Sequence, residues 1–480
     1  MKAKLVSTGV ACAASTLYIF IFTLGLGLFA GKAMGQVTLT NLYSFTAIDG
    51  SNSTAGLVQG HDGYFYGVTQ KGGIGGYGSA FVISPAGSYT NLYPFSYLFG
   101  GNPHGGLIQG TNGFFYGLTF QGGPGAMGGD GSVFTMDTQG DLSPLFAFPG
   151  TASADNGGFP YDSLVQGSDG CFYGTTYDSR YSALPVTNFG TIFRVSPDGS
   201  SYTNLHVFKA ADGGYSQAGL VQGSDGNFYG TASGGGVNGQ GTIFQITTNG
   251  TYANLHQLGG NEGAQPESAL VQGNDGNFYG TASAGGANSC GTIFRISPGG
   301  SFTNLHSLVS SEGSNPSAAL VLGSDGNFYG TTSAGGANNL GSVFRISPAG
   351  TLTTLYSFGS KAGDGAHPTA NLVQGMDGSF YGVTYDGGAN HEGTVFKLTA
   401  PLSTPANRIN NIYYKGTNMM MTIAAVAGEK YQLQYRDSLV GGTWSTVPGG
   451  WSTSIGGAMT VTNSGNGFPA MRIYRFAIMP

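Results

Sequence analysis

The chain has 480 residues, of which 88 are glycine, and only 8% of its residues are charged. Such a chain has many turns and few of the salt-bridged faces that helices carry, so its composition favours an all-β fold. The formal net charge of -6 and the lack of a basic stripe argue against a nucleic-acid partner.

Residues 1–35 have the features of a secretory signal peptide. Lys2 and Lys4 give a charged start, residues 10–30 are largely apolar, and Ala33-Met34-Gly35 forms a small-x-small cleavage site. We therefore expect a protein that is secreted, periplasmic or held at the cell surface. Because the apolar run is long, the alternative is an uncleaved signal segment that anchors the chain in a membrane.

One phrase, Leu-(Val/Ile)-(Gln/Leu)-Gly-x-(Asp/Asn)-Gly-x-Phe-Tyr-Gly, occurs seven times, and successive copies lie 50 to 57 residues apart. A period near 50 residues, filled with short runs of β-forming residues, is typical of a propeller blade. The repeat therefore predicts seven blades. The copies begin at Leu57, Leu107, Leu164, Leu220, Leu270, Leu320 and Leu372.

Each copy predicts four antiparallel strands, named a to d in chain order. In the sixth copy these are residues 319–322, 327–332, 341–346 and 352–358, separated by turn residues. Asp325-Gly326, between the first two apolar runs, predicts a two-residue type I′ hairpin, in which both central residues have positive φ.

The two ends of the repeat region predict how the ring closes. Residues 37–45 match strand d of a full repeat, whereas the seventh repeat stops after its third strand at Leu398. A strand from the N-terminus that completes the last blade would cover two sheet edges and tie the termini together. We therefore expect residues 36–400 to form a closed seven-bladed β-propeller.

The composition and the pattern of the sequence change after the repeats. Residues 401–407, which contain Pro401 and Pro405, predict a linker. Residues 408–480 hold six alternating runs and both tryptophans of the chain, which predicts a small β-sandwich module of the immunoglobulin or fibronectin kind.

The repeats resemble a known family. The units "LVQGSDGNFYGTASGGGVNGQGTIFQI" and "LVLGSDGNFYGTTSAGGANNLGSVFRISPAG" are similar to the GloVer tandem repeat of secreted bacterial choice-of-anchor proteins, over about residues 37–398. The C-terminal "YQLQYRDSLVGGTWSTV" is similar to a module that follows such repeats. The resemblance implies export and residence outside the cell or at its surface. It implies no activity and supplies no catalytic residues.

The loops between strands b and c and between strands d and a are the long ones, and they share one face of the propeller. We therefore expect any binding site on this long-loop face. The candidates on it are carboxylates for sugar hydroxyls or a cation, Arg180 for an anion and Tyr181 for stacking, with a solvated loop as the alternative. The full candidate set is Asp178, Arg180, Tyr181, Asp386, His391 and Glu392.

Two repeated side chains have structural interpretations. Six strand-a glutamines, from Gln59 to Gln374, could line a central channel, but an inter-blade hydrogen-bond ring is the favoured hypothesis. His206, His256 and His306 occupy a strand-d position that is tyrosine in other repeats, which favours packing over metal binding.

Motifs for nucleotide, metal or nucleophilic chemistry are lacking, so an enzyme is the less favoured interpretation. The leading hypothesis is a non-enzymatic exported scaffold that binds carbohydrate or a surface protein. The alternatives are a propeller-type polysaccharide hydrolase or lyase and a structural matrix or adhesion component. We expect no cofactor, and nothing in the sequence supports a Ca²⁺ site.

Overall fold

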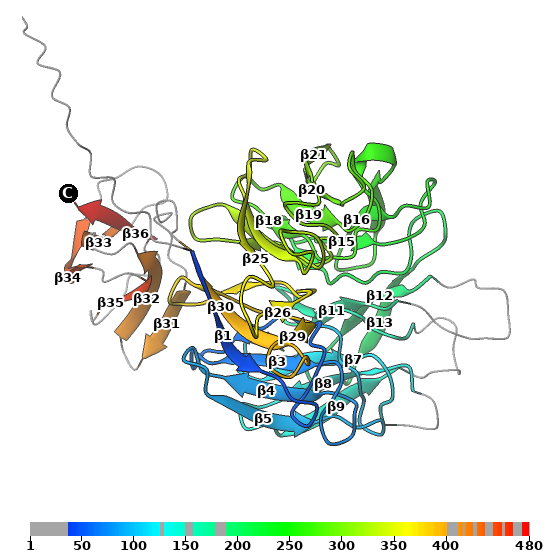
Figure 1. Cartoon of the computed structure of the whole chain (residues 1–480), viewed down its shortest axis with the longest axis horizontal. Helices are drawn as coiled ribbons and strands as arrows, with labels where there is room; N and C mark the ends of the chain where they lie inside the picture. Colours follow the sequence, from blue (N-terminus) through cyan, green and yellow to red (C-terminus); the bar gives the residue numbers. More distant parts are fainter. Residues whose placement is uncertain are drawn as a thin grey trace, which may run out of the picture. The chain divides into compact units, whose positions relative to one another are not determined.

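The computed structural model describes residues 37–124, 129–148, 157–177 and 189–400, together with the backbone of the strands between Asn411 and Met479. In these residues, seven four-stranded antiparallel sheets form the blades of a seven-bladed β-propeller (Figure 1). The predicted all-β propeller is thus confirmed. The segment 1–35, predicted as a signal peptide, and the predicted linker 401–407 lie outside the described residues.

Blades 1 to 6 each consist of strands a to d in chain order, and strand a is only two residues long. Blade 1 contains β2 Val58–Gln59, β3 Phe65–Thr69, β4 Ser79–Ile83 and β5 Tyr89–Pro94, and blade 2 contains β6 Ile108–Gln109, β7 Phe115–Thr119, β8 Ser132–Met136 and β9 Leu142–Ala147. Blade 3 contains β10 Val165–Gln166, β11 Phe172–Thr175, β12 Thr191–Val195 and β13 Tyr202–Val207, and blade 4 contains β14 Val221–Gln222, β15 Phe228–Ala232, β16 Thr242–Ile246 and β17 Tyr252–Gln257. Blade 5 contains β18 Val271–Gln272, β19 Phe278–Ala282, β20 Thr292–Ile296 and β21 Phe302–Ser307, and blade 6 contains β22 Val321–Leu322, β23 Phe328–Thr332, β24 Ser342–Ile346 and β25 Leu352–Ser357. A short 3-10 helix, η2 at Gly260–Glu262, precedes blade 5.

Blade 7 is built from both ends of the repeat region. Its strands are β27 Val373–Gln374, β28 Phe380–Val383 and β30 Thr394–Thr399, and its outer strand is β1 Thr38–Ser44. Figure 1 shows β1, in blue, beside β30. The side chain of Phe45, which follows β1, is fully buried in the core that blades 7 and 1 share. The predicted closure by an N-terminal strand is therefore confirmed.

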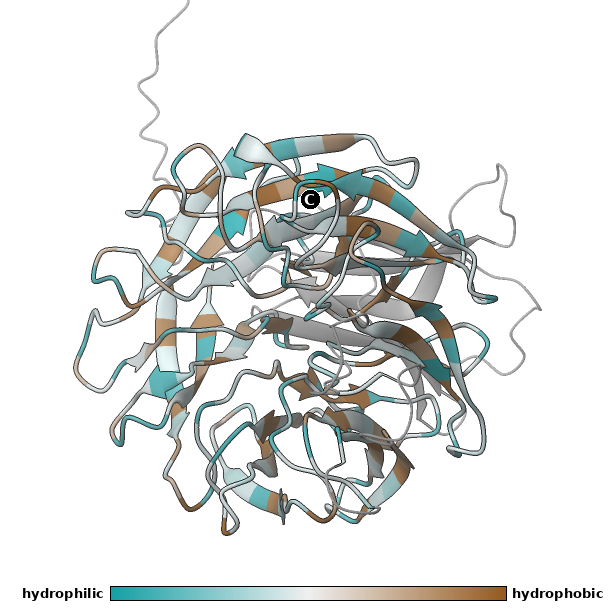
Figure 2. Cartoon of the chain, turned by 90° about the vertical axis from the view of Figure 1, so that its right-hand side faces the viewer, coloured by the Kyte–Doolittle hydropathy of each residue, from teal (hydrophilic) through white to brown (hydrophobic). Residues whose placement is uncertain are grey.

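Aromatic stacking joins each blade to the next, all the way around the propeller. The tyrosine of each Phe-Tyr-Gly packs on the first phenylalanine of the next blade, with ring centroids 3.9 to 4.2 Å apart. The last of these stacks, Tyr381 on Phe65, joins blade 7 to blade 1. In Figure 2 the strands carry hydrophobic segments that alternate with paler or hydrophilic ones, as the period of two in a strand requires.

The strand-a glutamines also join neighbouring blades. The Oε1 of Gln109, for example, accepts the backbone N–H of His61 in blade 1 at 2.9 Å. Its Nε2 donates to the carbonyl of Gly113 in its own turn at 2.8 Å. The same pair of bonds is made by Gln59, Gln166, Gln222, Gln272 and Gln374. The hypothesis of an inter-blade ring is thus confirmed, with Leu322 of blade 6 interrupting it.

The turn between strands a and b differs from the predicted type I′ hairpin. Gly326 has φ 80°, but Asp325 is not among the described residues with positive φ. The backbone N–H of Gly326 donates to the carbonyl of Gly323, so the turn is longer than two residues. The physical reason is local: Asp325 Oδ1 accepts the N–H of Asn327 at 3.1 Å and its Oδ2 accepts the Tyr329 hydroxyl at 2.9 Å.

The C-terminal strands form two three-stranded antiparallel sheets. One has the order β31 Asn411–Lys415, β32 Asn418–Ala425 and β35 Gly457–Asn463, and the other β34 Ser445–Thr453, β33 Lys430–Arg436 and β36 Ile473–Met479. All-β structure is therefore found here as well. That residues 408–480 form a β-sandwich of the immunoglobulin or fibronectin kind stays a prediction.

Candidate functional site on the propeller axis

A cavity of about 300 Å³ lies on the long-loop face. Its lining comes from the segment just before strand a in all seven blades, for example Thr54 of blade 1, Glu267 of blade 5 and Thr369 of blade 7. Because each blade of a ring contributes to it, the cavity lies on the propeller axis. We call it the axial cavity.

The residues that line it occupy a variable position of the repeat. The residue three places before the first leucine of each copy lines the axial cavity in every blade, and its side chain ranges from hydroxyl to carboxyl to aromatic. The residue just before it is serine or proline in every blade, and the two that follow are Ala, Gly or Ser except for Asp162 and Asn371. This position holds Thr54, His104, Tyr161, Gln217, Glu267, Ser317 and Thr369.

Two carboxyl groups face the axial cavity. Burial raises the pKa of Asp162, although its carboxylate accepts hydrogen bonds from the backbone N–H groups of Ser163 and Gly219, both at 2.7 Å. Since Gly219 belongs to the loop that enters blade 4, Asp162 connects two blades. Burial also raises the pKa of Glu267, and a hydrogen bond from Ser283 opposes that shift.

The part of the lining that comes from blades 2 and 3 includes the aromatic side chains of His104 and Tyr161. The rings of His104 and Tyr161 lie 4.4 Å apart at 37°. Burial lowers the pKa of His104 to about 4, and the charge of Lys71 adds to that effect. His104 is therefore neutral near pH 7, so its Nε2 accepts the Gln70 amide at 2.7 Å. Burial raises the pKa of the Tyr161 hydroxyl, and the nearby Glu267 charge raises it further.

A ring of strained backbone surrounds the cavity. The residue five places before the first leucine of each copy has φ between 49° and 56°, a region that only glycine and asparagine occupy readily. Its N–H donates to a carbonyl just before strand c of the preceding blade, at 2.6 to 3.2 Å. Each of these residues, in its left-handed conformation, thus donates a hydrogen bond to the preceding blade, and we call them the latch residues. The latch residues are Asn52, Asn102, Phe159, Tyr215, Gln265, Asn315 and His367.

Of the six predicted site residues, three lie outside the described residues: Asp178, Arg180 and Tyr181. Asp386 and His391 meet at a second hollow on the long-loop face, where His367 Nδ1 lies 2.8 Å from Asp386 Oδ1. The carbonyl of Glu392 accepts the N–H of Asn52, which closes the latch ring between blades 7 and 1.

Sequence reasoning chose the long-loop face, on which the axial cavity lies, but missed the residues that line this cavity. His104, Tyr161, Asp162 and Glu267 lie just before strand a, whereas the predicted residues lie in the long b–c loops of blades 3 and 7. The usable signal was different: one position varies strongly between a serine or proline and a pair of mostly small residues.

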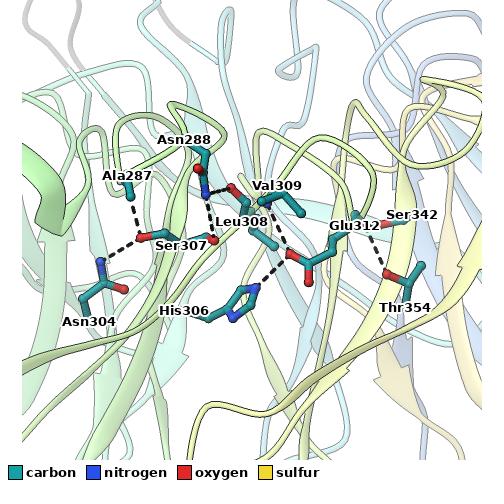
Figure 3. A network of polar contacts seen from close by, with 10 residues as sticks. All are labelled: Ala287, Asn288, Asn304, His306, Ser307, Leu308, Val309, Glu312, Ser342 and Thr354. Atoms are coloured by element: carbon teal, nitrogen blue, oxygen red, sulfur yellow. Dashed lines mark hydrogen bonds and ion pairs between the residues drawn. The ribbon is translucent and has the colours of Figure 1, made fainter.

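The strand-d histidines lie in polar networks on the outer part of the blades. Figure 3 shows His306, whose Nε2 lies 2.8 Å from Glu312 Oε2, a carboxylate that also accepts the N–H of Val309 at 3.2 Å. The backbone carbonyl of Glu312 accepts the Ser342 hydroxyl at 2.6 Å. His306 therefore helps to fix the loop that enters blade 6, in agreement with the packing interpretation.

Within the described part of the chain, no group of three or more His, Cys, Asp or Glu side chains is placed to hold a metal ion. A search of the described residues for helices found none with the length and apolar character needed to cross a bilayer.

Together, the fold and the axial cavity define a seven-bladed propeller with a polar and aromatic site on its axis. The family model described as Gloeobacter/Verrucomicrobia repeat matches residues 23–184, 125–320 and 219–437, so the chain belongs to this repeat family. No curated protein matches the chain.

Among solved structures, the chain is similar to a gluconolactonase from Xanthomonas campestris, with 13% identity, 77% of this chain and 91% of that chain covered, and a TM-score of 0.40. It is also similar to an α-L-arabinanase from Penicillium chrysogenum complexed with arabinobiose, with 14% identity, coverage of 66% and 98%, and a TM-score of 0.42. A fungal alcohol oxidase in complex with copper gives 11% identity, coverage of 91% and 92%, and a TM-score of 0.49. At these TM-scores the likenesses carry no conclusion about activity.

Proposed function

We propose that this protein is an exported, non-enzymatic scaffold that binds a neutral carbohydrate in the axial cavity. The observation that carries the proposal is the variable ring itself. Seven copies of one repeat place seven positions around the cavity, and these positions differ in hydroxyl, amide, carboxyl and aromatic character. A pseudosymmetric scaffold acquires a specific site in this way, by varying one position while the packing residues stay constant.

The charge of the lining favours a neutral ligand. None of the described residues that line the axial cavity is lysine or arginine, whereas Asp162 and Glu267 are carboxylic acids. An anionic ligand would meet these carboxyl groups without a cation to balance its charge. A neutral sugar presents hydroxyl groups that both donate and accept hydrogen bonds, which suits amide, hydroxyl and carboxyl partners.

The aromatic part of the lining supplies the other contact that a sugar requires. The C–H face of a pyranose or furanose ring is apolar and packs on flat aromatic side chains such as Tyr161. A cavity with an apolar face and a few convergent polar groups is the ordinary form of a small-molecule site. Tyr161 and Glu267, from blades 3 and 5, are the residues we place in direct contact with the sugar.

A polysaccharide hydrolase is the second candidate, because two carboxyl groups with raised pKa face one cavity. Glycoside hydrolysis generally uses two carboxyl groups, one as an acid and one as a base or nucleophile. Asp162, however, is engaged by the N–H groups of Ser163 and Gly219 and by the Ser163 hydroxyl. We therefore assign Asp162 to the connection between blades, which leaves one carboxyl group and favours binding without turnover.

A glycan array probed with the purified protein tests the proposal. The variants Tyr161→Ala and Glu267→Gln remove the proposed stacking surface and the proposed carboxyl acceptor. The control is Tyr64→Ala, since Tyr64 is 46% exposed in the a–b turn, on the opposite face.

We expect saturable binding to neutral glycans that both cavity variants weaken and that Tyr64→Ala leaves unchanged. If no glycan binds, the proposal is wrong, and a structural matrix or adhesion role becomes the better hypothesis. Release of reducing sugar from a bound glycan, abolished in Glu267→Gln, would instead establish the hydrolase.

A further inference from the structure

Aromatic residues continue outward from the axial cavity over one side of the long-loop face. Phe120 lies 4.7 Å from His104 and 5.9 Å from Tyr161, measured between ring centroids. Tyr177 follows at 6.1 Å from Tyr161, and Tyr215 follows at 5.5 Å from Tyr177. These steps are comparable with the length of one sugar ring, and all five side chains are partly exposed.

The ring contacts of this run link blades 2 to 4, and blade 7 adds Tyr385, which also lines the axial cavity. We compare the residue five places after the phenylalanine of each Phe-Tyr-Gly, which is Phe120 in blade 2, Tyr177 in blade 3 and Tyr385 in blade 7. In blades 4 to 6 the corresponding residue is a serine, Ser233, Ser283 or Ser333, whose hydroxyl donates to the carbonyl of the latch residue. Packing of the blades therefore does not require an aromatic ring here.

Two latch residues strengthen this argument. Phe159 and Tyr215 both have φ 54°, where a residue with a bulky ring is strained by about 1 to 2 kcal/mol. Blades 1, 2 and 6 use asparagine at the same position, with the same backbone bond to the preceding blade. The aromatic rings in blades 3 and 4 thus carry a cost that the latch itself does not demand.

We propose that this aromatic track, defined as His104, Phe120, Phe159, Tyr161, Tyr177 and Tyr215, binds successive units of a neutral polysaccharide chain. One unit of the chain occupies the axial cavity, and its neighbours stack on the rings of blades 3 and 4. The inference rests on the proposed function and specifies its ligand as a chain, in preference to a free monosaccharide.

The distribution of polar and aromatic side chains on the long-loop face defines the path that we propose for the polysaccharide. The wall of the axial cavity in blades 5 and 6 is polar, with Glu267, Ser268 and Ser317, whereas the aromatic track lies across the axis in blades 2 to 4. A chain that enters over Tyr215 and Tyr177 therefore makes its last aromatic contacts in the axial cavity, which Tyr161, His104 and Tyr385 line. Beyond that point its hydroxyl groups meet the hydrogen-bonding wall.

Calorimetry with gluco-, xylo- and manno-oligosaccharides, from monosaccharide to hexasaccharide, tests the inference on the full chain. The variant is Tyr215→Asn, which removes the outermost ring of the track and keeps a residue that tolerates positive φ. Gln265→Asn is the matched control, because it makes the same backbone change in blade 5 without removing an aromatic ring.

We expect affinity to rise with chain length in the wild-type protein. Tyr215→Asn should lose about tenfold of the affinity for the long oligomers, equivalent to about 1.4 kcal/mol, with the shortest binding oligomer unaffected. Gln265→Asn should keep the full dependence on length. Equal affinity for short and long oligomers, or an undiminished gain in Tyr215→Asn, would overturn the track and leave the proposed function standing. Failure of every sugar to bind would overturn both.

Discussion

Gln59 Oε1 accepts the backbone N–H of Met376 at 2.9 Å, across the junction of the first and last blades. The bond is the same one that glutamine makes between neighbouring blades elsewhere in the ring, so the junction has no special chemistry. Blade 7 is therefore held to blade 1 by the same hydrogen bond and aromatic stack that hold consecutive blades together.

The interruption of the glutamine ring at Leu322 gives the first prediction. Leu322→Gln places an acceptor where the other blades have one and should raise the free energy of unfolding by about 0.5–1.5 kcal/mol. Gln222→Leu should lower it by a similar amount, because it removes the bond to Ser168. Urea unfolding of both variants measures the effect. Equal and opposite changes are expected, and two destabilised variants would contradict the interpretation.

The outer strand of blade 7 should be as important for stability as an outer strand within a repeat. Phe45 follows β1 and Phe358 follows β25, and both side chains are fully buried. Phe45→Ala and Phe358→Ala should each lower the free energy of unfolding by about 3–5 kcal/mol. The comparison is made by guanidinium unfolding. A near-neutral Phe45→Ala beside a strongly destabilised Phe358→Ala would show that β1 does not close the ring.

The latch residues predict a reciprocal pair. Gln265→Asn should raise stability by about 1 kcal/mol, because asparagine tolerates the left-handed region better than glutamine. Asn315→Gln should lower it by about the same amount at the equivalent position of blade 6. Thermal unfolding of the two variants gives the result. If both shifts have the same sign, side-chain contacts outweigh backbone strain at these positions.

His104 predicts a loss of stability in acid. Its pKa is lowered to about 4 in the folded protein from the ordinary value of 6.5, so between these values the unfolded chain binds more protons. Stability should fall as the pH drops through this window, by up to about 3 kcal/mol. Urea unfolding at about pH 7 and about pH 4.5 should show this loss in the wild-type protein and a smaller one in His104→Gln.

The control for this prediction is the difference in pH dependence between the wild-type protein and His104→Gln. The raised pKa values of Asp162 and Glu267 act in the opposite direction, because the folded state then holds more protons than the unfolded chain. Their contribution is common to the wild-type protein and His104→Gln and cancels in the difference. An identical pH dependence of the two proteins would contradict the burial of His104.

The sequence allowed the ring to be predicted because its determinants are repeated. Tyr381 and Phe65 lie in copies of the same phrase, so the packing between them follows from the packing within any adjacent pair. The closure of blade 7 by β1 was predictable because residues 37–45 match strand d. The turn type was predicted wrongly, since Asp-Gly alone does not reveal that Asp325 bonds to Tyr329 and Asn327.

The site was harder to predict than the fold. Which loop residues converge on the axis depends on the inclination of the blades, and a single repeat does not contain that information. Glu267 and Tyr161, more than one hundred residues apart in sequence, line one cavity because consecutive blades are arranged around an axis. Asp386 and His391 do meet on the predicted face, but at the second hollow.

The pairing of β1 with β30 also sets an order of events during synthesis. Ser44 Oγ accepts the N–H of Ala389, a residue that lies 345 positions later in the chain. Among the described propeller strands, β1 therefore leaves the ribosome first, and its partner β30 follows only with the last blade. Contacts between such distant segments form slowly, and an exposed strand edge is prone to aggregation in the meantime. We infer that the nascent ring needs protection at its N-terminal strand until the final blade arrives.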